Sequence, residues 1–383
     1  MADTLTILGA SARAAAFSAV RAGIAPVAGD LFADVDLAAC SRATRVNRYP
    51  HDLARVCAGP QPGPWMYTGA LENWPDLVER MAGRRPLLGN DGRILREVRD
   101  PLRLRDALTA AGIDTPRVPL DPSQIPRDGS WLLKPLRSAG GHQIEPYAGD
   151  AAALSQQHWY YQEYIAGAVY SAVFVADGTA AVLLGATRQL VGEAWTHARQ
   201  FQYCGSIGPL ALAREEHAAL QTVGTCLVQA FQLRGVFGVD YVESAGRLWP
   251  IEVNPRYTAS AEIVEWHSKQ SIVGLHVAAC LGNLLPTTHQ SRATPIRGKA
   301  VLFARQAITV SNEMSQWLLD QNCEAPLGEG DDWEWPQFAD IPQPGTHLRA
   351  GAPVLTLFAC GDDDADVTAG LRAALAAVER RLY

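Results

Sequence analysis

The sequence predicts a multidomain protein that combines α/β and α+β parts, and three observations favour this class. A chain of 383 residues is longer than one ordinary hydrophobic core requires and suits two or three domains. Residues 4–30 alternate between apolar strand-like stretches and an alanine-rich helical stretch, which predicts a β-α-β unit. Residues 236–253 carry the alternating pattern of a β-hairpin, and residues 293–383 contain short predicted strands followed by one helix.

The β-α-β opening is Rossmann-like but lacks the signature of dinucleotide binding. Asp30 follows Gly9 by 21 positions, a spacing typical of dinucleotide-binding folds. The intervening turn reads GASARAAA and lacks the Gly-x-Gly-x-x-Gly glycines that allow close approach to a pyrophosphate. We therefore expect this part to bind no dinucleotide. Its turn residues Ser11 and Arg13 either face a substrate or lie on the surface.

Further elements follow from periodicity and from turn residues. Asp100 and Pro101 open an amphipathic stretch that Gly112 ends, which predicts a helix with proline at its first position. By the same patterns, we expect a strand at 131–134, a hairpin at 171–186, and helices at 213–232, 260–266 and 272–281. The stretch 187–210 reads as loop-rich, and long loops in compact domains often carry substrate contacts.

The composition excludes several classes of protein. A net charge of −7 argues against a nucleic-acid groove, and no apolar stretch approaches the length of a membrane span. The seven cysteines are scattered without a Cys-x-x-Cys pair, which indicates reduced thiols, and the N-terminus shows no secretory signal. We expect a cytoplasmic protein with no nucleic-acid or membrane partner, while homo-oligomer formation stays open.

A lysine and a glycine-rich loop follow the predicted strand at 131–134. The loop reads PLRSAGGHQI, and its small residues leave the backbone amides open to an anion. Lys134 supplies a point charge at the end of the strand. A phosphate cradle is therefore predicted, with a plain hairpin turn as the alternative; its residues are Lys134, Ser138, Ala139, Gly140 and Gly141.

The hairpin at 236–253 brings acidic residues together. If its turn is centred on Gly246, Asp240 lies opposite Glu252, with Cβ atoms about 5 Å apart on one face. Asn254, two residues further on, shares that face, and oxygen donors of this kind suit Mg²⁺. A two-residue turn would instead place Asp240 opposite Ile251, and a hairpin with solvated acids is the alternative.

Two residues near these acids add information. Pro250 cannot donate a ladder hydrogen bond, so it belongs at a sheet edge or a bulge. Arg256 brings a guanidinium beside the proposed metal, where a cation has little structural purpose.

The run VDYVESAGRLWPIEVNPR, preceded by Lys134 and its glycine-rich loop, resembles the metal-binding hairpin of the ATP-grasp superfamily. Biotin carboxylases, purine-pathway carboxylases and many carboxylate–amine ligases belong to that superfamily. The resemblance implies a Rossmann-like domain at 1–105, an ATP-grasp domain at 106–292 and a small α+β domain at 293–383.

The resemblance also implies a site for ATP and Mg²⁺. Asp240, Glu252 and Asn254 would hold the metal, and Lys134 would contact phosphate. The adenine-binding strand would comprise Gln162, Glu163, Tyr164 and Ile165, with the Glu163 carbonyl and the Ile165 amide toward the purine.

Two features of the superfamily are absent from this sequence. Many relatives carry Asp-Lys where this chain has Asp100-Pro101, so Arg99 or Arg103 would supply that phosphate contact. The acid or histidine that usually contacts the ribose is missing after Gly167.

The implied activity is that of an ATP-dependent ligase joining a small-molecule carboxylate and an amine through an acyl phosphate. Arg256, Lys134 and Arg188 are the catalytic candidates, and Arg256 would hold the carboxylate or stabilise an oxyanion. A small-molecule carboxylase and a nucleotide-binding regulatory protein without turnover are the alternatives. The resemblance also extends to enzymes that make pterin- or furan-based one-carbon carriers.

Overall fold

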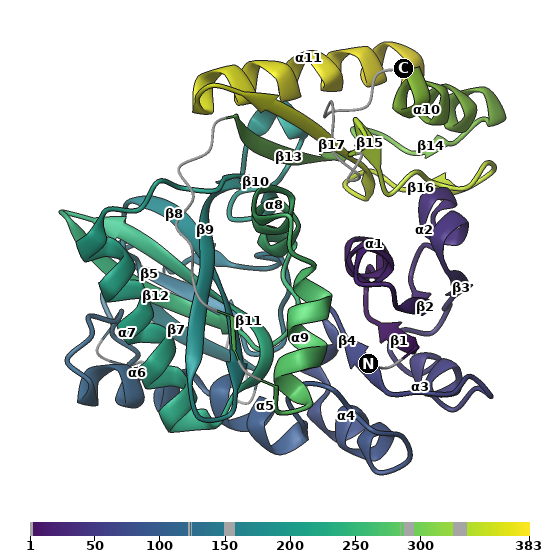
Figure 1. The fold of residues 1–383 in the computed structure, drawn as a ribbon. Helices are drawn as coiled ribbons and strands as arrows, with labels where there is room; N and C mark the ends of the chain where they lie inside the picture. Colours follow the sequence, from purple (N-terminus) through teal and green to yellow (C-terminus); the bar gives the residue numbers. More distant parts are fainter. Residues whose placement is uncertain are drawn as a thin grey trace.

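The computed structural model describes residues 3–121, 123, 125–148, 158–283, 285–286, 295–324 and 335–383. Figure 1 shows the N-terminal elements on one side, a large central sheet with its helices on the other, and the C-terminal strands and helices across both. This is the predicted mixed α/β and α+β class. None of the described helices is long and apolar enough to cross a bilayer.

The N-terminal part is a four-stranded parallel sheet with helices around it, in the strand order β3-β2-β1-β4. The strands are β1 (Thr4–Leu8), β2 (Ala25–Asp30), β3 (Arg42–Arg45) and β4 (Trp65–Tyr67). The helices are α1 (Arg13–Arg21), α2 (Val35–Cys40), α3 (Leu53–Cys57), η1 (Leu71–Asn73), α4 (Pro75–Ala82) and α5 (Gly92–Val98). Because the strands are parallel, the loops after β1, β2 and β4 meet at one edge of the sheet.

The helix α6 (Pro101–Ala110) connects this part to the next one, as its sequence predicts. Asp100 caps it by accepting hydrogen bonds from the backbone N–H groups of Leu102 and Arg103 at 2.9 and 3.2 Å. Gly112 follows its end with φ +71°, a conformation that favours glycine.

The central part combines two sheets. A three-stranded sheet consists of β5 (Trp131–Pro135), β6 (Glu145–Pro146) and β7 (Trp159–Glu163). The first five strands of an eight-stranded sheet are β8 (Ala168–Asp177), β9 (Ala181–Val191), β10 (Tyr203–Gly208), β11 (Arg234–Ser244) and β12 (Arg247–Asn254). Helices α7 (Arg214–Phe231), α8 (Ala259–Ser268) and α9 (Ile272–Cys280) pack on it, with the short helix η3 (Ala194–Thr196) after β9.

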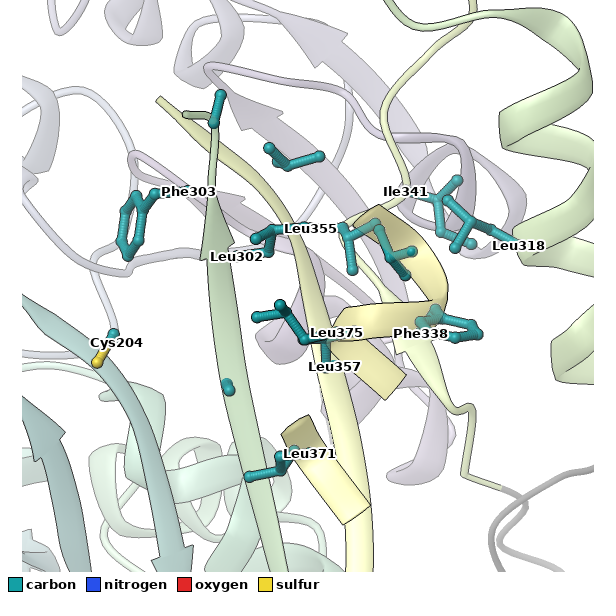
Figure 2. Packing of buried hydrophobic residues seen from close by; sticks show 14 of the residues in the cluster. Cys204, Leu302, Phe303, Leu318, Phe338, Ile341, Leu355, Leu357, Leu371 and Leu375 are labelled. Carbon is teal, nitrogen blue, oxygen red and sulfur yellow. The ribbon is translucent and has the colours of Figure 1, made fainter. Parts of the chain in front are cut away.

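The eight-stranded sheet continues into the C-terminal part, in the order β12-β11-β8-β9-β10-β13-β17-β15. Its elements are β13 (Ile296–Phe303), β14 (Ile308–Thr309), α10 (Asn312–Glu324), β15 (Phe338–Ala339), β16 (His347–Leu348), β17 (Pro353–Gly361) and α11 (Asp364–Leu382). Leu371 and Leu375 of α11 pack against Leu302 and Leu357 of the sheet (Figure 2). The boundary proposed near residue 293 therefore divides the chain without interrupting the sheet.

A buried histidine joins the N-terminal part to the central sheet. His276 on α9 is 2% exposed, and its Nδ1 accepts the backbone N–H of Val236 at 2.9 Å. Its Nε2 lies 3.0 Å from the carbonyl oxygen of Leu88, so the neutral ring donates there. Burial lowers the pKa of His276 to about 4. The neutral imidazole is therefore part of the folded structure.

We predict that His276 makes the protein sensitive to acid. Its pKa is lower in the folded than in the unfolded chain, so stability falls as pH drops from about 6.5 toward 4. Between pH 7 and pH 5 the loss from this group is about 2 kcal/mol. Urea unfolding of wild type and His276→Gln at both pH values measures it; equal losses in the two proteins would contradict this assignment.

Candidate functional site

A cleft of about 1080 Å³ lies between the loops of the N-terminal sheet, the three-stranded sheet and the eight-stranded sheet. Most of the site residues predicted from the sequence line it: Lys134, Ala139, Gly140, Gly141, Gln162, Glu163, Tyr164, Ile165, Asp240, Glu252, Asn254 and Arg256. The turn residues Ser11 and Arg13 line it too, on the N-terminal side. Ser138 and Arg188 are the predicted site residues outside this lining.

Asp240 and Glu252 face each other across β11 and β12, so the predicted pairing is confirmed. The turn that sets the strand register differs from the predicted one, which was centred on Gly246. Ala245 and Gly246 form a two-residue turn with φ +51° and +70°. That turn pairs Tyr241 with Pro250, and a bulge between Asp240 and Tyr241 then restores the acid pair. Strand β12 is also the edge of the sheet, so Pro250 occupies both kinds of position that suit proline.

Asp240 is held by two side-chain amides. Its Oδ1 accepts a hydrogen bond from Nε2 of Gln189 at 2.7 Å, and its Oδ2 accepts one from Nδ2 of Asn254 at 2.9 Å. Burial and the charge of Glu252 raise the pKa of Asp240 to about 6, despite these hydrogen bonds. The charge of Arg256 acts to lower the pKa of Asp240, so it compensates this carboxylate only in part.

Glu252 is in the opposite electrostatic situation. Its Oε1 lies 3.2 Å from a guanidinium nitrogen of Arg99. Burial acts to raise the pKa of Glu252, but the charges of Arg99, Lys134 and Arg256 outweigh it, and the net shift is downward. Glu252 is therefore a stable carboxylate at neutral pH.

Arg256 ends a chain of hydrogen bonds that starts at Asp240. One guanidinium N–H donates to Oδ1 of Asn254 at 3.0 Å, and Nε–H donates to Oε1 of Glu72 at 2.9 Å. Glu72 lies in η1, and its side chain is fully buried. We call this series of hydrogen-bonded side chains, Asp240–Asn254–Arg256–Glu72, the relay. Glu72 lies 184 positions from Arg256, and no local pattern marks it as a site residue.

Lys134 is 5% exposed, and its Nζ donates to Oε1 of Gln162 at 3.0 Å. Nε2 of Gln162 in turn donates to the carbonyl oxygen of Ile251 at 3.2 Å, which ties the three-stranded sheet to the acidic hairpin. Burial lowers the pKa of Lys134, but Tyr160, Glu252 and Asp240 raise it by more, so the ammonium form is favoured.

The glycine-rich loop is anchored through its backbone. The carbonyl oxygen of Ser138 accepts from Asn73 at 3.1 Å and from Arg99 at 3.4 Å, and that of Gly140 accepts from the Tyr203 N–H at 3.0 Å. A Cβ on Gly141 would lie 1.8 Å from the Phe201 carbonyl oxygen, so only glycine fits there.

Of the two arginines proposed to replace the missing lysine, Arg99 reaches this region. Arg103 lies 3.9 Å from Glu97, and its side chain is 61% exposed.

Arg188 requires a correction. It lies in strand β9, which extends to Val191, and not in a loop. Its guanidinium donates to Asp364 at 2.9 and 2.7 Å, outside the cleft. Successive side chains of a strand point to opposite faces, so the next residue, Gln189, faces Asp240. The expected loop-rich stretch likewise contains β10, which carries Tyr203 and Ser206.

The segment at Gln162–Ile165 lines the cleft. The side chain of Glu163 forms an ion pair with Arg117 at 2.9 Å, so it is engaged at the surface. Tyr164 donates its backbone N–H to the Ser130 carbonyl oxygen at 2.9 Å. The role of this segment in binding adenine stays a prediction.

The oxygen donors fit a hard cation bound together with a phosphate. Within the described residues there is no group of three His, Cys, Asp or Glu side chains that could hold a metal alone. Asp240 and Glu252 supply two carboxylates, and Asn254 supplies an amide oxygen that now accepts from Arg256. Mg²⁺ commonly uses one or two carboxylates and completes its coordination with phosphate oxygens and water.

Comparisons with known proteins show what this fold is similar to. Residues 98–260 match the family model described as an ATP-grasp domain. A search of curated protein sequences found no match. Among solved structures, N5-carboxyaminoimidazole ribonucleotide synthetase from Thermus thermophilus is 17% identical with a TM-score of 0.67, over 99% of this chain and 98% of that one.

Carboxylase structures share the fold as well. The biotin carboxylase domain dimer of Hydrogenobacter thermophilus 2-oxoglutarate carboxylase, solved with MgADP, ADP and bicarbonate, is 13% identical with a TM-score of 0.69, over 93% and 86% of the chains. Rhizobium etli pyruvate carboxylase is 14% identical with a TM-score of 0.68 over 97% of this chain, which spans only 39% of that protein. These likenesses establish the arrangement of a Rossmann-like part, an ATP-grasp part and a small C-terminal part.

We predict that Asp240 destabilises the ligand-free protein. Asp240→Asn should raise the free energy of unfolding at pH 7.5 by about 1 to 3 kcal/mol, because it removes a buried charge that faces Glu252 and that Arg256 compensates only in part. Urea unfolding measures the change. The matched control is Asp177→Asn in a surface turn, where the carboxylate accepts three hydrogen bonds and the substitution should lower stability. A destabilised Asp240→Asn protein would contradict this account of the pair.

Proposed function

We propose that this protein, whose residues 98–260 match an ATP-grasp domain model, is an ATP-dependent ligase that joins a small-molecule carboxylate to an amine and releases ADP and phosphate. The observation that carries the proposal is the relay, which holds the Arg256 guanidinium beside the opposed acids Asp240 and Glu252. Arg256 lines the same cleft as Lys134 and the glycine-rich loop. A protein that only stores a nucleotide does not need an arginine at this place.

Groups in the cleft and one arginine beside it would bind the nucleotide. Lys134 and the loop amides would contact the phosphates, and the backbone of residues 162–165 would meet the base. Arg99, outside the cleft lining but in contact with the Ser138 carbonyl oxygen, would supply the contact of the missing lysine. Asp240, Glu252 and Asn254 would hold Mg²⁺, which when bound neutralises charge on the β- and γ-phosphates.

The chemistry would take place in two steps. A carboxylate oxygen of the acid attacks the γ-phosphorus, the bond to the bridging oxygen breaks, and ADP leaves. The amine nitrogen then attacks the acyl carbon and loses a proton, and phosphate leaves as the amide forms. Arg256 would hold the carboxylate and stabilise the oxyanion of the second step, an interaction worth about 3 to 4 kcal/mol in comparable sites.

A small-molecule carboxylase is the second candidate. The fold matches a carboxyaminoimidazole ribonucleotide synthetase over nearly the full length of both chains, which favours this alternative. Bicarbonate would then take the place of the organic acid in the first step. A role in making pterin- or furan-based one-carbon carriers is a finer form of the ligase proposal, and it rests on the sequence resemblance.

We predict that wild-type protein forms ADP only when both an acid and an amine are supplied, and that Arg256→Ala lowers turnover by roughly two to three powers of ten. Both proteins are incubated with pools of acids and amines, and ADP release and hydroxylamine trapping of acyl phosphate are measured. These assays check the substrate requirement and the effect of the variant. ATP affinity should stay nearly unchanged in the variant.

The control for this variant addresses Glu72, whose buried carboxylate would lose its partner. The double variant Arg256→Ala with Glu72→Gln removes that unpaired charge and should be as inactive as the single variant. Full activity of either protein would exclude Arg256 from the mechanism. ADP release that needs bicarbonate but no organic acid would favour the carboxylase, and ATP binding without any turnover would favour a regulatory protein.

We predict that Glu252→Gln weakens MgATP binding at least tenfold, which removes about 1.4 kcal/mol of ligand stabilisation at saturating concentrations. Thermal melting with and without MgATP measures this effect. Glu243→Gln, an exposed site on the same hairpin, is the matched control and should respond to MgATP like wild type. If Glu252→Gln shows the wild-type shift as well, the acid pair does not bind metal.

A further inference from the structure

A second charged cluster lines the cleft on the side of the N-terminal sheet. Arg13, the first residue of α1, forms an ion pair with Glu262 of α8, and its guanidinium donates to both oxygens of Asp340 at 3.0 and 3.1 Å. Lys299 of β13 also donates to Glu262, at 2.9 Å. Asp36 lies 3.7 Å from Arg13. The cluster thus draws on all three parts of the chain.

Nearly every carboxylate in this cluster has donors of its own. Both oxygens of Asp36 accept backbone N–H groups, from residues 340 and 341 at 2.9 and 3.0 Å. Nearby Asp30 accepts three backbone N–H groups, from residues 12, 32 and 33. Glu262 is held by Arg13 and Lys299, and these charges lower its pKa to about 2 against the effect of burial.

Asp34 is the exception. Asp34 is 4% exposed. Both Asp34 and Asp340 line the cleft. Asp34 precedes α2, but its side chain does not cap that helix. Throughout the described part of the chain, its carboxylate accepts no hydrogen bond and forms no ion pair of 4.0 Å or less. Burial and then the charges of Asp340, Asp36 and Asp30 raise the pKa of Asp34 to about 9. A buried carboxylate without donors is strongly unfavourable unless a ligand supplies them.

The formal charges of the cluster point to a cation. Arg13 and Lys299 contribute two positive charges, while Glu262, Asp340 and Asp36 contribute three negative ones, and Asp34 adds a fourth when a bound cation holds it ionised. No group of described Asp, Glu, His or Cys side chains here has the spacing of a metal site. An ammonium group has three donors and one charge, and it needs no fixed coordination geometry. Leu31 and Phe32 also line the cleft beside Asp34, which suits a ligand with an apolar body.

We propose that Asp34, together with Asp340, binds the ammonium group of the amine substrate. The inference rests on the proposed ligase function and names which wall of the cleft receives the amine. The acid and the nucleotide would then bind on the opposite wall, which carries Lys134, Arg256 and the acidic hairpin. Asp34 is a binding residue in this arrangement.

The test compares amines with neutral molecules of the same shape. Full-length protein is titrated at pH 7.5 with benzylamine and benzyl alcohol, and with butylamine and butanol, by calorimetry in the presence of MgADP. Wild type should bind each amine at least tenfold more tightly than its alcohol. Asp34→Asn should lose this preference and bind both members of each pair equally.

Thermal melting shows whether a variant loses the preference for amines because it is unfolded. Asp34→Asn should melt at or above the wild-type temperature without ligand, because no hydrogen bond is lost and a neutral amide of similar shape replaces a carboxyl whose charged form is disfavoured by burial. Asp36→Asn should melt lower, because its carboxylate accepts two backbone N–H groups, and it should keep the preference for amines. No preference in wild type, or an unchanged preference in Asp34→Asn, would overturn the inference.

The same proteins separate this inference from the proposed function. Wild type that binds MgATP and forms ADP with an acid and an amine, but prefers no amine over its alcohol, would overturn the amine site alone. Wild type that fails to bind MgATP would overturn the ligase proposal, whatever the amine data show.

Discussion

The site depends on the repulsion between Asp240 and Glu252, two acids that the hairpin holds face to face. Like charges on directly paired residues of neighbouring strands are unfavourable unless cations surround them. The protein supplies Arg99 and Lys134 next to Glu252 and the Arg256 end of the relay next to Asp240. The cations come from three separate regions of the chain, so the N-terminal part, the three-stranded sheet and the hairpin must assemble before the site is electrostatically balanced.

Much of this fold could be predicted from local patterns. The β-α-β opening, the helix that Asp100 and Pro101 begin, and the helix that is now α7 all follow from periodicity and capping residues. The opposition of Asp240 and Glu252 was also predicted, although for an incomplete reason. The turn alone would have separated them, and the bulge next to Pro250 corrects the register. Proline at position 250 is the residue in the sequence that indicates this bulge.

The sequence could not reveal contacts between residues that are far apart along the chain. Glu72, Asn73 and Gln189 touch the site from elements far from the hairpin, and nothing in their local sequence marks them. Arg188 is a catalytic candidate because of its charge, yet its guanidinium donates to Asp364, while the neighbouring Gln189 reaches Asp240. The unpaired state of Asp34 likewise depends on tertiary burial and not on any motif.

The continuous sheet restricts how the cleft can open. Strand β13 is hydrogen-bonded to β10, with Gly205 to Gly208 paired to Arg297 to Ala300. A hinge rotation of the C-terminal part as a rigid lid would break this ladder and expose its backbone groups to water. The three-stranded sheet β6-β5-β7 shares no ladder with the large sheet and is attached through side chains such as Gln162. Opening of the cleft therefore calls for displacement of that small sheet, while the wall that carries Arg13, Lys299 and Asp340 stays in place.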